Sequence, residues 1–222
     1  MACLVVLGQA HAGRPMATDD TQTLARGDCQ IEAWGEHADV ERSQVLAPAC
    51  GLTDTLELDT AVSRNVGSGA KATALAAGLK WVPAEAVWET ALGTIGLGAE
   101  AGVFWARDAA SGWRADSIAL VALGSLAMGP AWNLYANVIA TRRQSDGKWG
   151  SGLRTALAWQ PDERGLLLVE GLAATDSTRV RNAGFRWWVV PQVLGFDLVA
   201  TRSTASGLSL SLGFGWYGIR LP

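Results

Sequence analysis

The chain has 222 residues, of which 49% are hydrophobic and only 18% are charged, and its formal net charge is −3. That small negative charge excludes nucleic acid as an expected partner, because nucleic-acid-binding proteins carry a clear excess of basic residues. The charged fraction is low for a soluble domain, yet no apolar run reaches the roughly 18 residues that a transmembrane helix needs. A membrane-spanning β-barrel satisfies both observations, because its apolar residues occupy alternate positions.

Tryptophan is the most abundant aromatic residue, with eleven copies against two tyrosines and four phenylalanines. Trp rings favour the interface between lipid and water, where the ring meets the headgroups. The count therefore favours a membrane protein, and a soluble protein with a large core is the alternative.

Residues 1–12 are similar to the apolar part of a secretory signal and end in the cleavage pattern Ala10-His-Ala12, without the usual basic region before it. The alternative is a buried N-terminal strand. Cleavage after Ala12 leaves Cys29 and Cys50, and an even pair of cysteines in an exported protein predicts a disulfide. Residues 13–27 are polar and contain Gly and Pro, so we interpret them as an extended periplasmic segment that precedes a barrel domain over 28–222.

From Asp28 onward, turn signals separate about twelve candidate strands. Most are long enough for a tilted strand to cross a bilayer, which takes roughly 9–11 residues. Residues 206–217 show the pattern best, because Leu208, Leu210 and Leu212 alternate with Gly and Ser in a strict period of two. The candidate strands are 28–37, 42–49, 54–65, 70–82, 86–105, 113–128, 131–142, 149–160, 165–174, 182–190, 192–202 and 206–219. The sequence thus predicts an all-β fold, a closed antiparallel transmembrane β-barrel of about 12 strands.

The connections suggest an orientation, because barrels of this kind alternate short periplasmic turns with longer outer loops. The shorter, Pro-containing connections fall on one side, at 83–85, 129–130, 160–164 and 191. If that side is periplasmic, both termini lie in the periplasm and the strand number is even. Cys29 then begins the first strand and Cys50 ends the second, so the two residues lie side by side at the periplasmic edge.

Charged residues at strand centres must face the lumen if the apolar residues face lipid, since Arg or Lys at mid-bilayer costs about 2–4 kcal/mol. The predicted lumen-lining residues are Glu32, Glu57, Asp59, Lys80, Arg154, Glu170, Arg186 and Asp197. Both signs are present, so these groups can pair across the lumen. Two interpretations of the lumen stay open, a narrow polar pore and a salt-bridged plug. A barrel of about eight strands is filled by side chains and one of 16 to 18 strands leaves a channel, and twelve strands lie between these numbers.

The sequence contains no recognisable catalytic constellation, so we expect no enzyme, no cofactor and no metal site. His37 lies next to an outer loop with only Ser43 nearby, and a Ser–His pair needs a further group that orients the His. Gly96, Gly98 and Gly102 are spaced too irregularly for a dinucleotide-binding loop and sit within a strand pattern, where glycines mark bends or close packing.

The segments Arg14-Pro-Met-Ala-Thr-Asp-Asp20, Cys29-Gln-Ile-Glu-Ala-Trp34 and Pro48-Ala-Cys50 resemble a group of proteobacterial outer-membrane proteins. They are similar to the transporter family named after the phenol-degradation meta-pathway, and the resemblance covers about residues 14–59. It implies a channel or transporter for aromatic or other small hydrophobic compounds in the outer membrane of a Gram-negative bacterium. The expected partners are membrane lipid, the outer-membrane assembly machinery and a small-molecule solute. A structural or binding barrel with a plugged lumen is the alternative.

Overall fold

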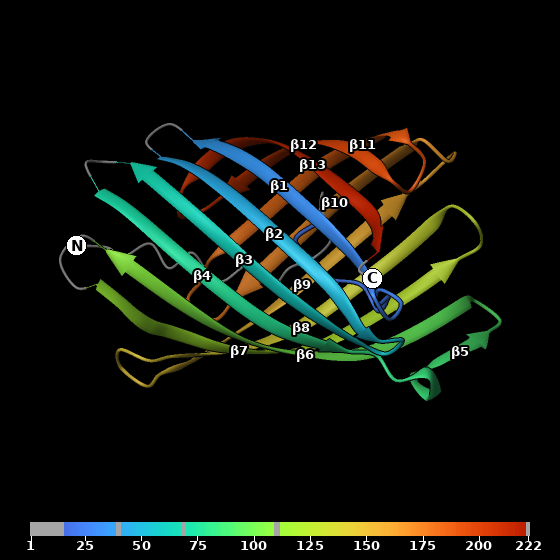
Figure 1. Cartoon of the computed structure of the whole chain (residues 1–222), viewed down its shortest axis with the longest axis horizontal. Coiled ribbons are helices and arrows are strands. Elements are labelled where there is room, and N and C mark those ends of the chain that lie inside the picture. Colours follow the sequence, from blue (N-terminus) through green and yellow to red (C-terminus); the bar gives the residue numbers. More distant parts are fainter. Residues whose placement is uncertain (1–15, 39–40, 68–69, 109–111, 221–222) are drawn as a thin grey trace.

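A computed structural model describes residues 16–38, 41–67, 70–108 and 112–220, and the predicted signal remnant lies outside these ranges. The described chain is an antiparallel β-barrel in which the first strand pairs with the last (Figure 1). Its strands are β1 (Asp28–Ala38), β2 (Glu41–Thr53), β3 (Leu56–Gly67), β4 (Ala70–Trp81), β5 (Val87–Thr90), β6 (Gly93–Asp108), β7 (Gly112–Met128), β8 (Trp132–Arg143), β9 (Trp149–Trp159), β10 (Gly165–Ala174), β11 (Arg179–Val190), β12 (Leu194–Ser203) and β13 (Gly207–Arg220).

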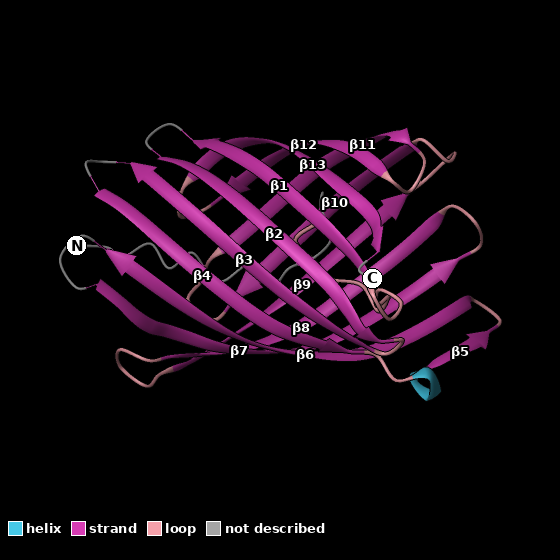
Figure 2. Cartoon of the chain, viewed as in Figure 1, coloured by secondary structure: helices cyan, strands magenta, loops and turns pink. Residues whose placement is uncertain are grey.

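Twelve of these strands form the closed wall, as the sequence predicted, because β4 pairs with β6 and β5 pairs only with β6. Figure 2 shows that the described chain is otherwise loops, apart from the short 3-10 helix η1 (Ala84–Ala86). No helix in the described ranges is long and apolar enough to cross a membrane.

The barrel exposes its apolar side chains and buries its polar ones. In β13 the exposed fractions of Leu208, Leu210 and Leu212 are 59, 53 and 67%, whereas Ser209 and Ser211 are each only 4% exposed. Apolar side chains on other strands are exposed as well, among them Phe214, Trp132, Leu134 and Phe196. Soluble proteins bury apolar side chains and expose polar ones. The reverse arrangement seen here is the one that a lipid-facing barrel wall requires.

Exposed tryptophans lie near both ends of the barrel. One end, which we call the disulfide end, holds the start of β1 and the end of β13. Near it lie the exposed rings of Trp81, Trp88, Trp132, Trp159, Trp187 and Trp216. Trp113 and Trp149 lie near the opposite end. These positions match the two aromatic belts of a membrane barrel.

The predicted disulfide is confirmed. Cys29 and Cys50 are directly opposite in the register of β1 and β2, their Cα atoms are 4.1 Å apart, and a disulfide joins them. An ion pair of 3.1 Å between Arg220 Nε and Asp28 Oδ1 links β13 to β1 at the same end. The disulfide end therefore carries a covalent link between β1 and β2 and an ionic link between β1 and β13.

The prediction of a single strand over 86–105 is wrong. The chain turns back at Ala91 and Leu92, so that β5 and β6 form a hairpin. Gly93 has a φ of 134°, which L side chains rarely adopt, and a Cβ atom there would lie 1.9 Å from the Ala127 carbonyl oxygen. The turn residues Ala91 and Leu92 are apolar, so the sequence shows no polar turn signal that would divide the strand there.

The expected contrast in connection length is also wrong. Apart from the β4–β6 connection, which holds η1 and β5, the strand bounds leave two to five residues between consecutive strands at both ends. Connection length therefore does not tell the two ends apart.

Candidate functional site

The eight charged residues that the sequence assigned to the lumen are all buried, with exposed fractions of 2–8%. Each occupies a strand position whose two neighbours in sequence are more exposed than it is, so each points into the barrel. They form two groups, one around Lys80 and Arg154 and one around Arg186. The first group is completed by a segment that was predicted to lie in the periplasm.

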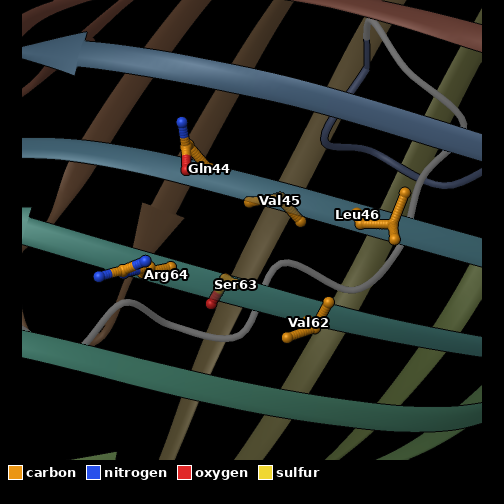
Figure 3. Close-up of a pocket in the computed structure, with 6 residues that line it drawn as sticks. All are labelled: Gln44, Val45, Leu46, Val62, Ser63 and Arg64. Carbon is orange, nitrogen blue, oxygen red and sulfur yellow. The ribbon is translucent and has the colours of Figure 1, made fainter.

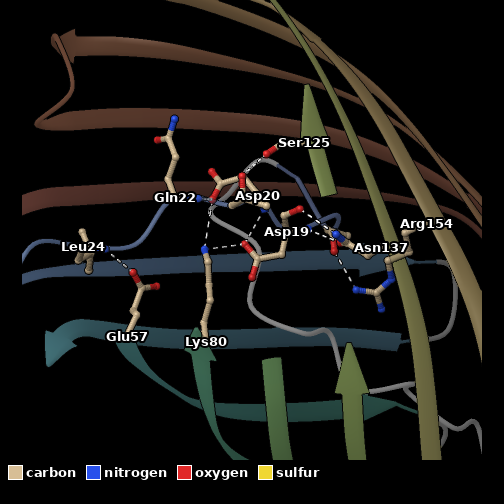
Figure 4. Close-up of polar contacts among 11 residues, drawn as sticks. Asp19, Asp20, Gln22, Leu24, Glu57, Lys80, Ser125, Asn137 and Arg154 are labelled. Atoms are coloured by element: carbon tan, nitrogen blue, oxygen red, sulfur yellow. Dashed lines mark hydrogen bonds and ion pairs between the residues drawn. The ribbon is translucent and has the colours of Figure 1, made fainter. Parts of the chain in front are cut away.

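Residues 16–27, which we call the lumen segment, run inside the barrel as far as Leu24 and reach the rim at the disulfide end over 25–27 (Figure 4). From the sequence, this stretch was predicted to be an extended periplasmic segment. Its side-chain and backbone hydrogen bonds instead reach six strands of the wall: β3, β4, β7, β8, β9 and β10. The reason is that buried backbone N–H and C=O groups need partners, and here the charged and polar lumen side chains provide them.

Glu170 and Arg154 hold the first part of the lumen segment. The Glu170 carboxylate accepts hydrogen bonds from the backbone N–H groups of Ala17 and Thr18, at 2.8 and 2.7 Å. Arg154 Nη1 donates to the Ala17 carbonyl oxygen at 2.8 Å, and Asn182 Nδ2 donates to Glu170 at 3.0 Å. A negative and a positive side chain thus bind the donor and the acceptor of one short piece of backbone.

Asn137 holds the next residue from β8. Its Oδ1 accepts the Asp19 backbone N–H at 2.6 Å, and its Nδ2 donates to the Asp19 carbonyl oxygen at 3.0 Å. Thr18, Asp19 and Asn137 are each only 1% exposed. A water-filled passage at this level would leave such side chains exposed, so the lumen is closed here.

Lys80 is surrounded by carboxylates. Its Nζ lies 3.1 Å from Asp19 Oδ1 and 3.2 Å from Asp20 Oδ1. In the register, Lys80 lies between Glu57 on β3 and Glu100 on β6. Asp59 Oδ2 and Glu100 Oε2 are buried and have no hydrogen-bond partner among the described residues.

In the two charged groups described above, carboxylates outnumber basic groups by eight to three. The carboxylates belong to Asp19, Asp20, Glu32, Glu57, Asp59, Glu100, Glu170 and Asp197, and the basic groups to Lys80, Arg154 and Arg186. The described lumen therefore carries a formal excess of negative charge. A cation passing through it would be attracted, and an anion repelled.

Glycines make room for the rest of the lumen segment. Thr21 forms a side-chain hydrogen bond with Ser125 of β7, and a Cβ at Gly96 would lie 2.1 Å from Thr21 Oγ1. Nearer the disulfide end, a Cβ at Gly51 would lie 2.3 Å from the Leu24 carbonyl oxygen. The Leu24 N–H donates to Glu57 at 2.7 Å. Gly96 and Gly51 thus allow close packing against the lumen segment. For Gly96 this agrees with the prediction that it marks a bend or close packing and not a dinucleotide-binding loop.

The second charged group is independent of the lumen segment. Arg186 binds Asp197 through two hydrogen bonds, Nε to Oδ1 at 2.6 Å and Nη2 to Oδ2 at 3.0 Å, and lies 3.6 Å from Glu32. Tyr217 accepts a hydrogen bond from Arg186 and donates one to Glu32. The Arg186 guanidinium also lies over the rings of Trp188 and Tyr217, 4.9 and 5.2 Å from their centroids. This network ties β1, β11, β12 and β13 together.

His37 is not arranged for catalysis. It is exposed and accepts a hydrogen bond from Arg42 Nε at 3.2 Å. Ser43 pairs in register with Glu36, so its side chain points to the opposite face of the sheet from His37. Within the described ranges, no three His, Cys, Asp or Glu residues are placed to hold a metal ion.

Sequence reasoning missed Asp19, Asp20 and Glu100 as lumen residues. Glu100 follows the inward period of β6, so the correct start of that strand at Gly93 would have assigned it. Asp19 and Asp20 belong to no strand, and strand periodicity therefore carries no signal for them.

Comparisons with known proteins agree on the fold. Residues 1–152 match the family described as Uncharacterised conserved protein UCP029691, and no curated protein sequence matches the chain. The KdgM porin in complex with disordered oligogalacturonate is similar, with a TM-score of 0.62, 10% identity and coverage of 84% of this chain and 98% of that one.

Two further structures are similar at comparable levels. The COG4313 outer membrane channel from Pseudomonas putida F1 has a TM-score of 0.59 and 14% identity, covering 89% of this chain and 98% of that one. The NanC porin has a TM-score of 0.58 and 6% identity, covering 85% and 98%. At such low identity these similarities show only the fold of this chain, which is that of an outer-membrane β-barrel. They do not support the finer resemblance of residues 14–59 to the phenol-degradation transporters.

Proposed function

Because the chain belongs to the UCP029691 family of uncharacterised conserved proteins, whose description names no activity, we propose a function from the lumen itself. The protein is a channel for small solutes in the outer membrane of a Gram-negative bacterium, and the lumen segment holds it in a closed state. The disulfide end faces the periplasm. The channel is not an enzyme.

The observation that carries this proposal is what fills the barrel. Many inward positions of the wall are Gly or Ala, including Gly96, Gly102, Ala156 and Ala158. A barrel built only for stability would fill its lumen with large side chains from its own strands. Here a separate segment, belonging to no strand, fills part of the space and is held by polar contacts. Withdrawing it would leave a passage lined by polar groups and small residues.

The charge of the lumen bears on the class of solute. The resemblance of residues 14–59 suggests aromatic or small hydrophobic compounds, and the similar KdgM porin was solved in complex with oligogalacturonate. An excess of carboxylates disfavours anionic solutes in the present lumen, because like charges in a narrow pore repel. We therefore propose neutral or cationic small molecules, aromatic ones included, as the solutes.

Single-channel recording of the purified protein in planar bilayers tests the proposal. The double variant N137A/E170Q removes two anchors of the lumen segment, and we expect it to open more often than the wild type and to conduct cations in preference to anions. The matched control is Glu163→Gln, which removes a carboxylate from the exposed turn between β9 and β10 instead of from the lumen. It should conduct like the wild type.

A structural barrel with a permanently plugged lumen is the second candidate. The nearly complete burial of Thr18, Asp19 and Asn137 favours it. In that case N137A/E170Q would lower thermal stability and produce no channel conductance in the bilayer, and a variant lacking residues 16–25 would behave in the same way. That pair of results would exclude the channel.

A further inference from the structure

The opposite end of the barrel carries a belt of arginines on lipid-facing positions. They are all exposed, and we call them the arginine belt: Arg42, Arg64, Arg107, Arg142, Arg179, Arg181 and Arg202. In the strand register, Arg181 and Arg202 pair with each other. The other residues that pair with the belt are His37, Gln44, Val66, Thr73, Trp113, Ile118, Trp149, Gly171, Ala173 and Leu208. None of these cross-strand partners is a carboxylate.

The disulfide end has the reverse composition. Its strand ends and connections carry the acidic residues Asp28, Asp54, Glu85, Glu89, Asp162 and Glu163, against the basic residues Arg26, Arg164 and Arg220. The opposite end also carries the acidic residues Glu41, Asp116, Asp146 and Asp176, but the arginine belt alone outnumbers them, so the two rims of the barrel differ in the sign of their net charge. A membrane with anionic headgroups on one side matches this asymmetry.

Arg181 and Arg202 are the centre of the belt. They are directly opposite each other in the register of β11 and β12, and neither has an ion-pair partner among the described residues. Like charges at directly opposed positions destabilise a sheet. An anion between the two guanidinium groups would turn this repulsion into attraction, and a phosphate suits it because guanidinium binds phosphate through paired hydrogen bonds.

A shallow groove between β2 and β3 offers a second position of the same kind (Figure 3). Gln44 and Arg64 pair across the two strands at one end of the groove, and Leu46 and Val62 pair at the other. Arg42 lies beyond Gln44 toward the rim. A headgroup at the polar end would place its acyl chain along the apolar end, in the direction of the bilayer centre.

We propose that the arginine belt binds the phosphorylated headgroup of an anionic outer-leaflet lipid. The grounds are the paired arginines, the apolar side chains next to them toward the bilayer centre, and the opposite charge of the other rim. The Arg181–Arg202 pair is the main site. The side chains face lipid at the level where headgroups lie, just outside an apolar band that includes Phe185 and Leu198. The inference rests on the orientation proposed above, with the disulfide end in the periplasm, and not on whether the lumen conducts.

The test measures lipid binding by native mass spectrometry of the full purified protein in detergent micelles. The probes are lipid A, which carries phosphomonoesters and acyl chains, lipid A with its phosphates removed, and inorganic phosphate. We expect the wild type to retain lipid A, and R181Q/R202Q to bind it roughly thirty-fold more weakly, because each basic residue near an anionic surface adds a similar increment of attraction. Dephosphorylated lipid A should bind as weakly to the wild type.

The matched control is R26Q/R164Q, which removes the same charge from the exposed rim at the disulfide end. It should bind lipid A like the wild type. In lipid-free micelles R181Q/R202Q should be at least as heat-stable as the wild type, because it relieves a like-charge contact. That result shows the variant to be folded.

Three outcomes would overturn the proposal. They are equal retention of lipid A by R181Q/R202Q and the control, equal retention of dephosphorylated lipid, and displacement of lipid A by inorganic phosphate. The last would indicate a site for free anions rather than for a lipid.

Discussion

The side-chain amide of Asn137 pairs with the backbone of Asp19 as a neighbouring strand would, accepting its N–H at 2.6 Å and donating to its carbonyl oxygen at 3.0 Å. Asn137 thereby replaces the strand partner that the lumen segment lacks. Its position at the middle of β8 keeps the segment across the lumen, where both residues are buried. This contact is one of several that hold the lumen segment in place, together with those of Glu170 and Arg154.

Asn137→Ala should destabilise the protein, because it leaves a backbone donor and a backbone acceptor buried without partners. Each such group costs about 1–3 kcal/mol, so the urea midpoint of unfolding in micelles should fall clearly. The control is Asn133→Ala on the same face of β8, which is less buried. An equal fall in both variants would mean that Asn137 does not hold the lumen segment.

Gly96→Ala should displace the lumen segment while leaving the barrel folded. The added Cβ would lie 2.1 Å from Thr21 Oγ1 and 3.0 Å from Thr21 Cβ, so Thr21 must move. Limited proteolysis with proteinase K, followed by mass measurement, should then reveal new cleavage between Thr18 and Leu24. At Gly102 the nearest atom to an added Cβ is 3.5 Å away, so Gly102→Ala should digest like the wild type. Identical digestion of both variants contradicts the prediction.

Removing the Cys29–Cys50 disulfide should lower stability without opening the lumen. The bridge joins residues 21 apart in sequence, and a loop of that size is worth roughly 3 kcal/mol. The double variant C29S/C50S should therefore unfold at lower urea, and its segment should stay as resistant to proteinase K as in the wild type. Two free thiols in the wild-type protein isolated under non-reducing conditions would refute the bridge itself.

Arg186→Ala should be strongly destabilising, because it strips Asp197 and Glu32 of their buried counter-charge. Breaking a buried ion pair from one side costs about 3–5 kcal/mol. The double variant R186M/D197L removes both members of the closest pair and should recover much of that loss in thermal melts. No recovery would mean that Arg186 contributes through its contacts with Trp188 and Tyr217 instead.

In an open channel, Arg186→Ala and Arg154→Ala should both shift ion selectivity toward cations, since each removes a positive charge from the lumen wall. The reversal potential in a salt gradient measures this shift. Arg164→Ala, on an exposed turn at the disulfide end, is the control with the same loss of charge. Unchanged reversal potentials in both lumen variants, together with lower stability, would favour the plugged barrel.

The sequence by itself determined the wall of this protein. Alternation over residues such as Leu208, Ser209 and Leu210 specifies which face meets lipid, because side chains in a strand point to opposite faces in turn. The same period assigned Lys80, Glu170 and Arg186 to the interior, where the structure places them. The opposed ends of the first two strands also sufficed to predict the Cys29–Cys50 bridge.

Only the tertiary structure decided what fills that wall. A polar stretch such as residues 16–27 satisfies its backbone equally well in water or against buried side chains, and its sequence does not distinguish the two. The choice depends on Glu170, Arg154 and Asn137, which lie more than a hundred residues away and converge only when the barrel closes. Likewise, the Arg181–Arg202 opposition arises from strand register, which a sequence pattern of period two leaves undetermined.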